Sequence, residues 1–283
     1  MNHVVIFCAI PPEMAAFTSA MPTEDAERVG VFPRRTGQIA ERRISLVLCG
    51  MGKVHAAAAA QAAIAQLAPD ALLSCGTAGG LDPQLAVGDV VIGATAIQHD
   101  YGFVTPDAFI PFGLYIAPAQ GRREYVRAFP ADPTLLAAAS ACAEQPPASP
   151  NIVTGAILTG DQVIFSAAKR HALREEFAAS AVDMESAAIA QVCAMHRLPF
   201  LSVRAISDYA DESANLDLSR LDPNELAEFS AAPLGKKLGV LAKTLRYVAQ
   251  HPSAFAASLQ MRQRMNLASA RAAGVVMRLL EHL

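Results

Sequence analysis

Short apolar runs recur along the chain, and most of them end at small or polar residues. The runs at 4–10, 70–75, 152–158 and 200–206 have the length and continuity of buried strands. Residues 54–67 are almost all alanine, and apolar side chains recur at helical spacing from 188 to 195. This alternation predicts an α/β fold, which we expect to be a three-layer α/β/α sandwich around a mixed, largely central sheet.

Length and composition favour a single domain. The chain has 283 residues, of which 53% are hydrophobic, so it can bury a large core. We expect one domain over residues 1–283, with a helical insert at about 222–260 and a last helix over roughly 261–280.

The charge pattern argues against nucleic acid as a partner. The net charge is -3, and the longest cationic clusters are the pairs Arg34 with Arg35 and Arg42 with Arg43, which are too short to follow a phosphate backbone. No apolar run has transmembrane length, and the N-terminus lacks the basic region of a signal peptide. We therefore expect no membrane partner.

Cysteine usage indicates a reducing compartment, the cytoplasm. An odd count without a C-x-x-C pair favours buried free thiols over a disulfide framework or a zinc site. No metal or organic cofactor is expected. The five cysteines are Cys8, Cys49, Cys75, Cys142 and Cys193.

Three acidic residues come directly after predicted strands. Glu13 follows the first apolar run, Asp208 follows the run at 200–206, and Glu185 stands where a strand gives way to a helix. Acids at helix starts are common for structural reasons, as partners of the helix dipole or as N-caps. Because ligands of α/β sheets bind at the carboxyl ends of strands, the same three carboxylates also suit one shared site.

Glycines cluster in two places between predicted elements. Residues 76–80 read Gly-Thr-Ala-Gly-Gly, which is typical either of a tight turn or of a loop whose bare backbone lets a ligand approach. Residues 50–53 read Gly-Met-Gly-Lys, which lacks the spacing and the Ser or Thr of a phosphate-binding P-loop.

Several strings resemble, in the same order, those of the purine nucleoside phosphorylase superfamily. The nearest resemblance is to the bacterial methylthioadenosine/S-adenosylhomocysteine nucleosidases, and it covers residues 3 to about 218 and, loosely, the last helix. It implies a nucleoside phosphorylase-like fold, a homodimer, and a hydrolase that cleaves adenine nucleosides in nucleoside catabolism and methionine salvage. The strings are GMGKVHAAAA, GTAGGLDP, VGDVVIG, VDMESAAIA and RAISDYAD.

The resemblance also implies two catalytic residues. Asp208 protonates the purine at N7, which requires it to hold a proton near neutral pH, and Ser207 orients its carboxyl group. Glu13 positions and activates the attacking water. The family more often has several acids around Glu13, whereas Pro11 and Pro12 stand at two of those places here.

Further positions are implied to bind the substrate. Glu185 accepts a hydrogen bond from a ribose hydroxyl, and Met184 packs against the sugar. The glycine-containing segment lies near the anomeric carbon through Thr77, Ala78 and Gly79.

Two loops are expected to hold the ends of the nucleoside. Residues 159–165 resemble the loop that holds the purine, where Val163 and Ile164 enclose the base. Val163 replaces an aromatic residue, so stacking falls to Phe165 or Tyr209. Residues 102–133 predict a long loop over the pocket. The resemblance implies that this loop contacts the 5′ substituent, here through Phe103, and that it does so partly across a dimer interface.

Two alternatives stay open on the sequence. A phosphorylase needs arginines around its phosphate, and the places that carry them in that branch hold the turn at 11–14 and Ser74 here. Arg42 or Arg43 of a neighbouring subunit is the remaining source of such a charge. A non-catalytic nucleoside-binding protein is the other alternative, against which the three acids together argue. The 5′ substituent also stays open between methylthio, homocysteinyl, hydrogen, futalosine-like and hopanoid-linked groups.

Overall fold

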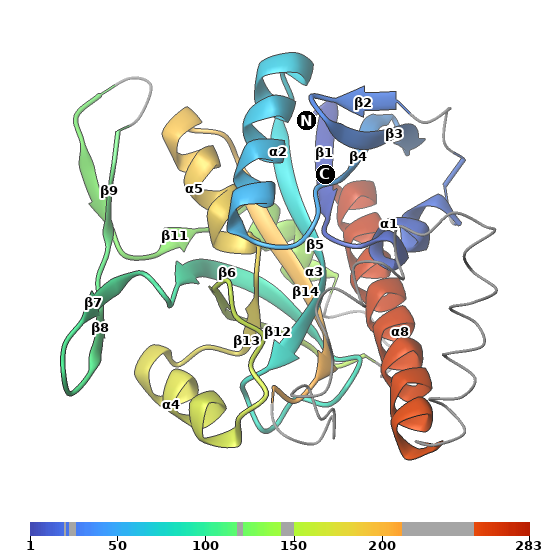
Figure 1. Ribbon diagram of the computed structural model, residues 1–283. Coiled ribbons are helices and arrows are strands. Elements are labelled where there is room, and N and C mark those ends of the chain that lie inside the picture. Colours follow the sequence, from blue (N-terminus) through green and yellow to red (C-terminus); the bar gives the residue numbers. More distant parts are fainter. Residues whose placement is uncertain (20, 23–26, 118–120, 143–149, 211–251) are drawn as a thin grey trace, which may run out of the picture.

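The computed structural model describes residues 1–283 except 20, 23–26, 118–120, 143–149 and 211–251 (Figure 1). Within the described residues, ten strands form one mixed sheet, and two short hairpins lie apart from it. The strands are β1 (His3–Cys8), β2 (Glu27–Val29), β3 (Phe32–Ile39), β4 (Arg42–Leu48), β5 (Ala71–Gly80), β6 (Val90–Gln98), β7 (Gly102–Val104), β8 (Phe109–Pro111), β9 (Leu114–Ile116), β10 (Glu124–Val126), β11 (Phe129–Pro130), β12 (Ile152–Thr159), β13 (Ala181–Asp183) and β14 (Phe200–Asp208).

The central strands close into a ring. β14 pairs with β5 in parallel and with β6 antiparallel. β6 continues through β12 to β13, and β13 returns antiparallel to β5. The mixed sheet with its helices agrees with the predicted α/β class. The three-layer sandwich is not confirmed, because these strands form a ring and not an open central layer.

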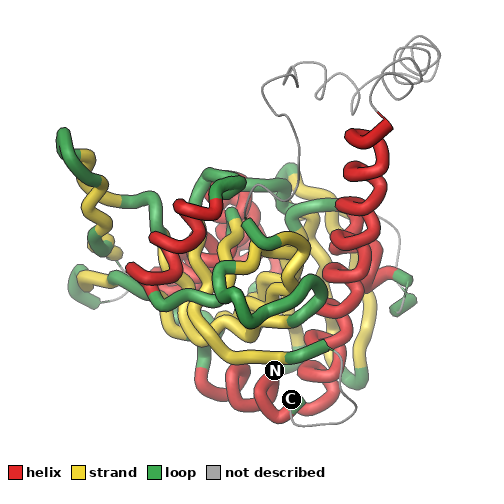
Figure 2. The backbone as a smooth tube through the Cα atoms, turned by 90° about the horizontal axis from the view of Figure 1, so that it is seen from below, coloured by secondary structure: helices red, strands yellow, loops and turns green. Residues whose placement is uncertain are grey.

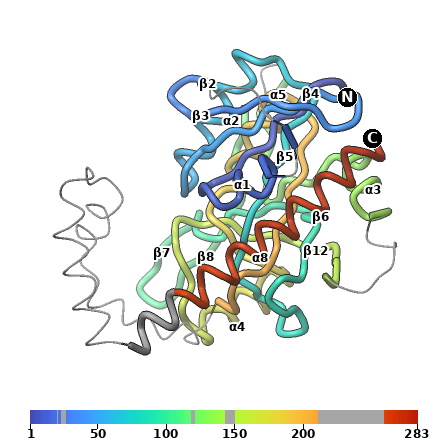
Figure 3. Tube along the Cα trace, turned by 90° about the vertical axis from the view of Figure 1, so that its right-hand side faces the viewer, coloured from blue at the N-terminus to red at the C-terminus, as the bar shows by residue number. Residues whose placement is uncertain are grey.

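Helices cover the sheet on both faces. β1 shows why, since Val4 and Ile6 pack into one apolar cluster with α1, α3 and α8, and Val5 and Phe7 pack into another with α2 and α5. Figure 3 shows α8 running along the first of these faces beside α1. The helices are α1 (Pro11–Thr18), α2 (Lys53–Leu67), α3 (Pro133–Ala141), α4 (Ala167–Phe177), α5 (Ser186–His196) and α8 (Pro252–His282).

The predicted helical insert at about 222–260 lies largely outside the described residues, which stop at 210 and resume at 252. The last helix begins earlier than predicted, at Pro252 in place of about 261. Figure 2 shows this helix extending past the body of the molecule at its N-terminal end.

The predicted long loop at 102–133 is wrong, because this segment forms strands. β7 pairs with β8 and β9 pairs with β10, both antiparallel. These two hairpins, which we call the arm, project from the body on the left of Figure 1. The runs between the Pro and Gly residues of this segment are short, but three residues are enough for one strand of a hairpin.

The glycine-rich segment at 76–80 is also not a loop, since β5 continues through it to Gly80. All five cysteines are buried free thiols. Among the described residues, no helix is long and apolar enough to cross a membrane, and no group of three or more His, Cys, Asp or Glu side chains is arranged to hold a metal ion.

Candidate active site

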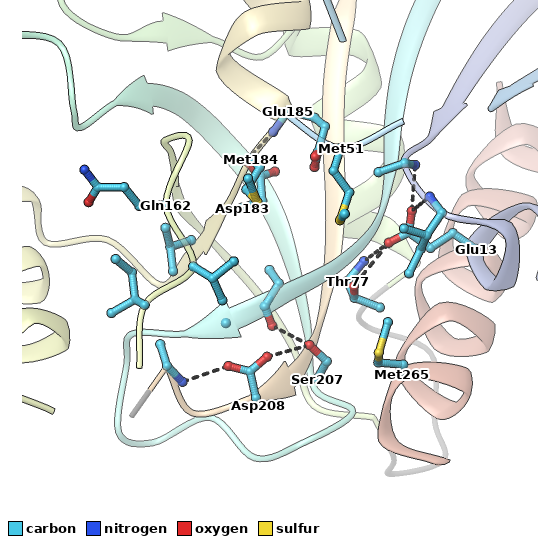
Figure 4. A pocket seen from close by; sticks show the side chains of 18 residues that line it. Glu13, Met51, Thr77, Gln162, Asp183, Met184, Glu185, Ser207, Asp208 and Met265 are labelled. Carbon is cyan, nitrogen blue, oxygen red and sulfur yellow. Dashed lines mark hydrogen bonds between the residues drawn. The ribbon is translucent and has the colours of Figure 1, made fainter. Parts of the chain in front are cut away.

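A pocket lies at the carboxyl ends of β1, β5, β13 and β14. Its cavity measures about 180 Å³. Figure 4 shows side chains from these separate parts of the chain converging on it. Since ligands bind at the carboxyl ends of strands in α/β proteins, this is the candidate active site. It is lined by Ala9, Ile10, Glu13, Met51, Thr77, Ala78, Gly79, Gln162, Val163, Ile164, Val182, Asp183, Met184, Glu185, Ser207, Asp208, Ala210 and Met265.

Glu13 is buried and held from two sides. Its Oε2 accepts hydrogen bonds from the backbone N–H groups of Ala9 at 2.8 Å and Ile10 at 3.3 Å. Its Oε1 accepts from the Thr77 backbone N–H at 2.8 Å and the Thr77 hydroxyl at 3.1 Å. The bond from the Ile10 N–H caps the start of α1, because Ile10 is the N-cap residue and Glu13 reaches back to it, so the structural interpretation of this acid also holds.

Gly76 makes room for this arrangement. A Cβ at that position would lie 2.7 Å from Glu13 Oε2, and even closer to the other carboxylate oxygen. The close approach of a carboxylate to the β5 backbone therefore requires glycine there.

Glu185 stands just before α5 and is also buried. Its Oε1 accepts a hydrogen bond of 2.9 Å from the backbone N–H of Gly52, and its Oε2 lies 3.5 Å from Arg204 Nη2. Burial raises the pKa of Glu185 to about 7, with Arg204 acting in the opposite direction and Asp183 adding to the rise. This carboxyl group therefore changes charge near neutral pH.

Arg204 is a buried cation behind the pocket. Its Nε lies 2.8 Å from Asp183 Oδ2, and its Nη2 donates to Ser74 Oγ at 2.6 Å. Burial works against the charge, but Asp183 and Glu185 raise the pKa of Arg204 above its ordinary value. Arg204 is a charged residue within the apolar run at 200–206, which was the signal in the sequence for a buried ion pair. It was assigned no role from the sequence.

Asp208 ends β14 next to an irregularity in pairing. The register between β14 and β5 shifts between Ile206 and Asp208, and both Ser207 and Asp208 line the pocket. Asp208 Oδ2 accepts from the Ser207 hydroxyl at 2.8 Å, and its Oδ1 accepts from the Ala210 backbone N–H at 2.9 Å. Ser207 thus contacts the carboxyl group that it was predicted to orient.

The three acids face the pocket from different sides. In Figure 4, Glu185 lies at the top with Met184 beside it, Asp208 at the bottom, and Glu13 with Thr77 at the right. Such a set can supply a proton on one side of a bound molecule and accept one on another.

The predicted base loop contributes Val163 and Ile164 to the pocket. The loop is held through Asp161, whose Oδ1 accepts from the Lys53 backbone N–H at 2.9 Å and whose own N–H donates to Asp100 at 2.9 Å. Val163 is 64% exposed.

No aromatic ring is among the described residues that line the pocket. Phe165 and Tyr209 were expected to supply stacking, and neither lines it. Within the described part of the chain, the apolar side chains that line the pocket are therefore aliphatic or methionine.

Phe103 lies elsewhere. It is on β7 in the arm, 62% exposed, and stacks on Phe112 with ring centroids 4.3 Å apart. It does not line the pocket of its own chain.

Sequence reasoning missed several pocket residues. Met51 lies in the glycine-containing string at 50–53, which was the available signal, and Ile10 ends the first apolar run. Met265 comes from α8, far along the chain, and only its place on an apolar helix face marked it.

Comparison with known proteins gives a consistent picture. The family model described as the phosphorylase superfamily matches residues 3–243. A 5′-methylthioadenosine/S-adenosylhomocysteine nucleosidase of Mycobacterium bovis is 33% identical over 250 residues, which are 84% of this chain and 97% of that protein.

Solved structures match over the full length. A nucleosidase of the same name from Neisseria meningitidis, in complex with methylthio-immucillin-A, is 28% identical with a TM-score of 0.72, and the match covers 100% of both chains. The futalosine hydrolase of Helicobacter pylori has a TM-score of 0.72 at 22% identity, over 100% of this chain and 98% of its own. At that identity the likeness concerns the fold alone.

Proposed function

This chain belongs to the phosphorylase superfamily, and we propose that it is an N-glycosidic bond hydrolase within it. It cleaves 5′-substituted adenine nucleosides, with methylthioadenosine and S-adenosylhomocysteine as the leading substrates, to adenine and the free sugar. The Mycobacterium bovis relative bears that activity in its name, and the similar Neisseria structure holds methylthio-immucillin-A. Methionine salvage is the process in which we place the reaction.

The convergence of Glu13, Glu185 and Asp208 on one pocket carries the proposal. Cleavage of an N-glycosidic bond passes through an oxocarbenium-like state. It needs a proton for the departing base on one side of the sugar and a nucleophile on the other. Asp208 supplies the proton to the purine, with Ser207 and the Ala210 N–H fixing its carboxyl group.

Glu13 is the group that handles water. Both of its oxygens already accept hydrogen bonds from Thr77 or from the β1–α1 turn, so the carboxylate is fixed in place before substrate binds. The Thr77 hydroxyl bond, at 3.1 Å, is the one that a water can exchange most readily, because a hydroxyl rotates and a backbone N–H does not.

Glu185 accepts a hydrogen bond from a ribose hydroxyl, and Met184 packs against the sugar. The ionised carboxylate is the better acceptor, so ribose binding strengthens as pH rises through the pKa of Glu185 at about 7. Ala78 and Gly79 offer bare backbone beside the reacting carbon.

The charge of the pocket favours water over phosphate as the nucleophile. No Lys or Arg side chain is among the described residues that line it, whereas four acids are. A phosphate dianion needs arginine forks or several backbone donors. The pocket therefore supports a phosphorylase less well than a hydrolase.

The arm supports a homodimer. It exposes Phe103, Val104, Ile110 and Tyr115, each at least half exposed, on hairpins that project from the body (Figure 1). We assign this apolar surface to a second copy of the chain, with Phe103 reaching the 5′ group of the partner's nucleoside. Sedimentation of the purified protein as a monomer at micromolar concentration contradicts the assignment.

The five buried free thiols are consistent with a reducing compartment, so we place the enzyme in the cytoplasm.

Product analysis tests the function. The full-length protein is incubated with methylthioadenosine with and without phosphate, and Asp208→Asn serves as the matched inactive control. We expect adenine and free methylthioribose at the same rate in both buffers. Strict dependence on phosphate, with a sugar phosphate as product, makes the protein a phosphorylase. Binding of adenine nucleosides with no cleavage across a panel of 5′ groups makes it a binding protein.

A further inference from the structure

Arg204 is shared unequally between two acids. Its Nε lies 2.8 Å from Asp183 Oδ2, but its Nη2 lies 3.5 Å from Glu185 Oε2. The side chains of Arg204 and Asp183 are almost fully buried, at 2% and 1% exposed. A buried guanidinium with two carboxylates in reach has therefore formed its tight ion pair with the one that is not assigned to the substrate.

The hydrogen bonds around Asp183 hold its carboxylate in place against Arg204. Its Oδ1 accepts from Thr159 Oγ1 at 2.6 Å and from the backbone N–H groups of Glu185 and Ser186 at 3.2 Å. Its Oδ2 accepts from the Ser186 hydroxyl as well as from Arg204. These donors come from β12, from the start of α5 and from β14, so the carboxylate cannot move towards or away from Arg204 without breaking several bonds.

The other end of the guanidinium is also held. Arg204 Nη2 donates to Ser74 Oγ on β5 at 2.6 Å, which draws it away from Glu185. Between Asp183 and Ser74, the plane of the guanidinium is fixed across the ring of strands.

We propose that Asp183 is a positioning residue, which holds Arg204 through Nε and so keeps Glu185 out of a tight ion pair and available to a ribose hydroxyl. This inference rests on the proposed function for the role of Glu185. The unequal sharing of Arg204 between Asp183 and Glu185 does not depend on the proposed function.

The charges around Glu185 fix the direction of the effect. Asp183 and Glu13 face it as like charges and raise its pKa, Arg204 lowers it, and burial is the largest cause of the rise. The Cys49 thiol also lies close enough to interact with Glu185, and it stays neutral because burial raises its own pKa to about 12. Removing the charge of Asp183 leaves Arg204 with Glu185 as its nearest strong acceptor, so the pKa of Glu185 falls.

A purely structural Asp183 predicts something different. As a counter-ion of Arg204 and a partner of the α5 N-terminus, it would affect the free energy of unfolding when replaced. Loss of its like charge alone also lowers the pKa of Glu185 in the variant that still folds, but a purely structural role leaves KM at pH 8 unchanged and predicts no effect of Ser74→Ala on the titration of Glu185.

Asp183→Asn in the full-length protein tests the proposal, with the Glu185 carboxyl followed by carbon-13 NMR during a pH titration. We expect the pKa of Glu185 to fall from about 7 towards the ordinary value of glutamate. At pH 8, where Glu185 is ionised in both proteins, we expect KM to rise several-fold with kcat nearly unchanged. A folded variant with an unaltered Glu185 titration overturns the proposal.

Ser74→Ala is the second variant, and it decides the matter if Asp183→Asn does not fold. Loss of the Ser74 acceptor lets Nη2 approach Glu185, so the pKa of Glu185 falls in the same direction by a smaller amount. Ser202→Ala is the matched control, because Ser202 contacts Ser186 and not the guanidinium. We expect no change in its Glu185 titration, and a fall as large as that of Ser74→Ala contradicts the proposal.

The titration reads Glu185 without turnover, which separates the two claims. A wild-type protein that cleaves no adenine nucleoside defeats the proposed function, and the shift in Asp183→Asn still tests the sharing of Arg204. Cleavage by the wild type together with an unshifted titration in both variants defeats only the present inference.

Discussion

We call Glu13, Glu185 and Asp208 the floor of the pocket. Each lies at or just after the carboxyl end of a strand and accepts a hydrogen bond from a backbone N–H group. Met51 and Val163 at its mouth, which we call the rim, are 61% and 64% exposed. The floor is fixed by backbone donors that the fold supplies. The rim is made of adaptable apolar side chains on connecting segments.

This difference separates the chemistry from the choice of substrate. Side chains held by several donors keep one position, as a proton donor or a water-binding group must. Methionine and valine at an open mouth adapt to groups of different shape. We therefore assign bond cleavage to the floor and tolerance of the 5′ substituent and the base to the rim.

Replacing Asp208 should have the largest effect. Asp208→Asn removes the acid that protonates the base, and we expect kcat to fall by ~10²–10⁴-fold. The fold should persist, because the amide oxygen can still accept from the Ala210 N–H, while the Ser207 hydroxyl can rotate and accept from the amide NH2 group. Single-turnover kinetics and thermal unfolding measure both. Wild-type turnover in a folded variant would remove Asp208 from the mechanism.

Glu13→Gln should come next, with a loss of roughly 10²-fold in kcat. It should also lower Tm, because an amide that accepts from Ala9 and Ile10 turns its NH2 group towards the Thr77 N–H. An unsatisfied buried N–H costs about 1–3 kcal/mol. Kinetics and calorimetry test this together. A lower Tm with unchanged kcat would leave Glu13 with its capping role alone.

Glu185→Gln should act mainly on KM. Losing a hydrogen bond to a charged group costs about 1.5 kcal/mol or more, so KM rises ~10-fold. In the wild type, kcat/KM should rise with pH through about 7, since the raised pKa of Glu185 keeps it protonated below that value. The variant should lose this acid limb. A variant profile identical to that of the wild type would assign the limb to another group.

A rim substitution should have the smallest effect. Val163→Phe places a ring beside the base, and aromatic contacts are worth about 0.5–1.5 kcal/mol, so KM for adenine nucleosides should fall a few-fold with kcat unchanged. Val163→Leu is the control for added volume. A fall in kcat comparable to that of the floor variants would break the division between floor and rim.

The sequence predicted the floor well for a physical reason. A buried strand is a continuous apolar run, and an acid directly after it must lie at the carboxyl edge of the sheet, as Glu13 and Asp208 do. Glu185 was predicted in the same way from its place between a strand and a helix, and the family strings added the roles of the three acids. The same reasoning from apolar runs placed β12 and β14 within two residues of their ends, and it located β5 except for its last five residues.

The rest depended on contacts that no local pattern encodes. Closure of the ring needs β14 to pair with both β5 and β6, which the runs alone do not specify. The segment at 102–133 is rich in Pro and Gly, so its three-residue strands were read as a loop. Met265 reaches the pocket only because α8 crosses the face beside α1.

A crystal structure of the protein with methylthio-immucillin-A, the molecule bound in the similar Neisseria structure, tests the central claim most directly. We expect the base against Asp208, a sugar hydroxyl on Glu185, and a water between Glu13 and the sugar-like ring. An inhibitor bound away from these three acids, or an anion in the place of that water, would contradict the account.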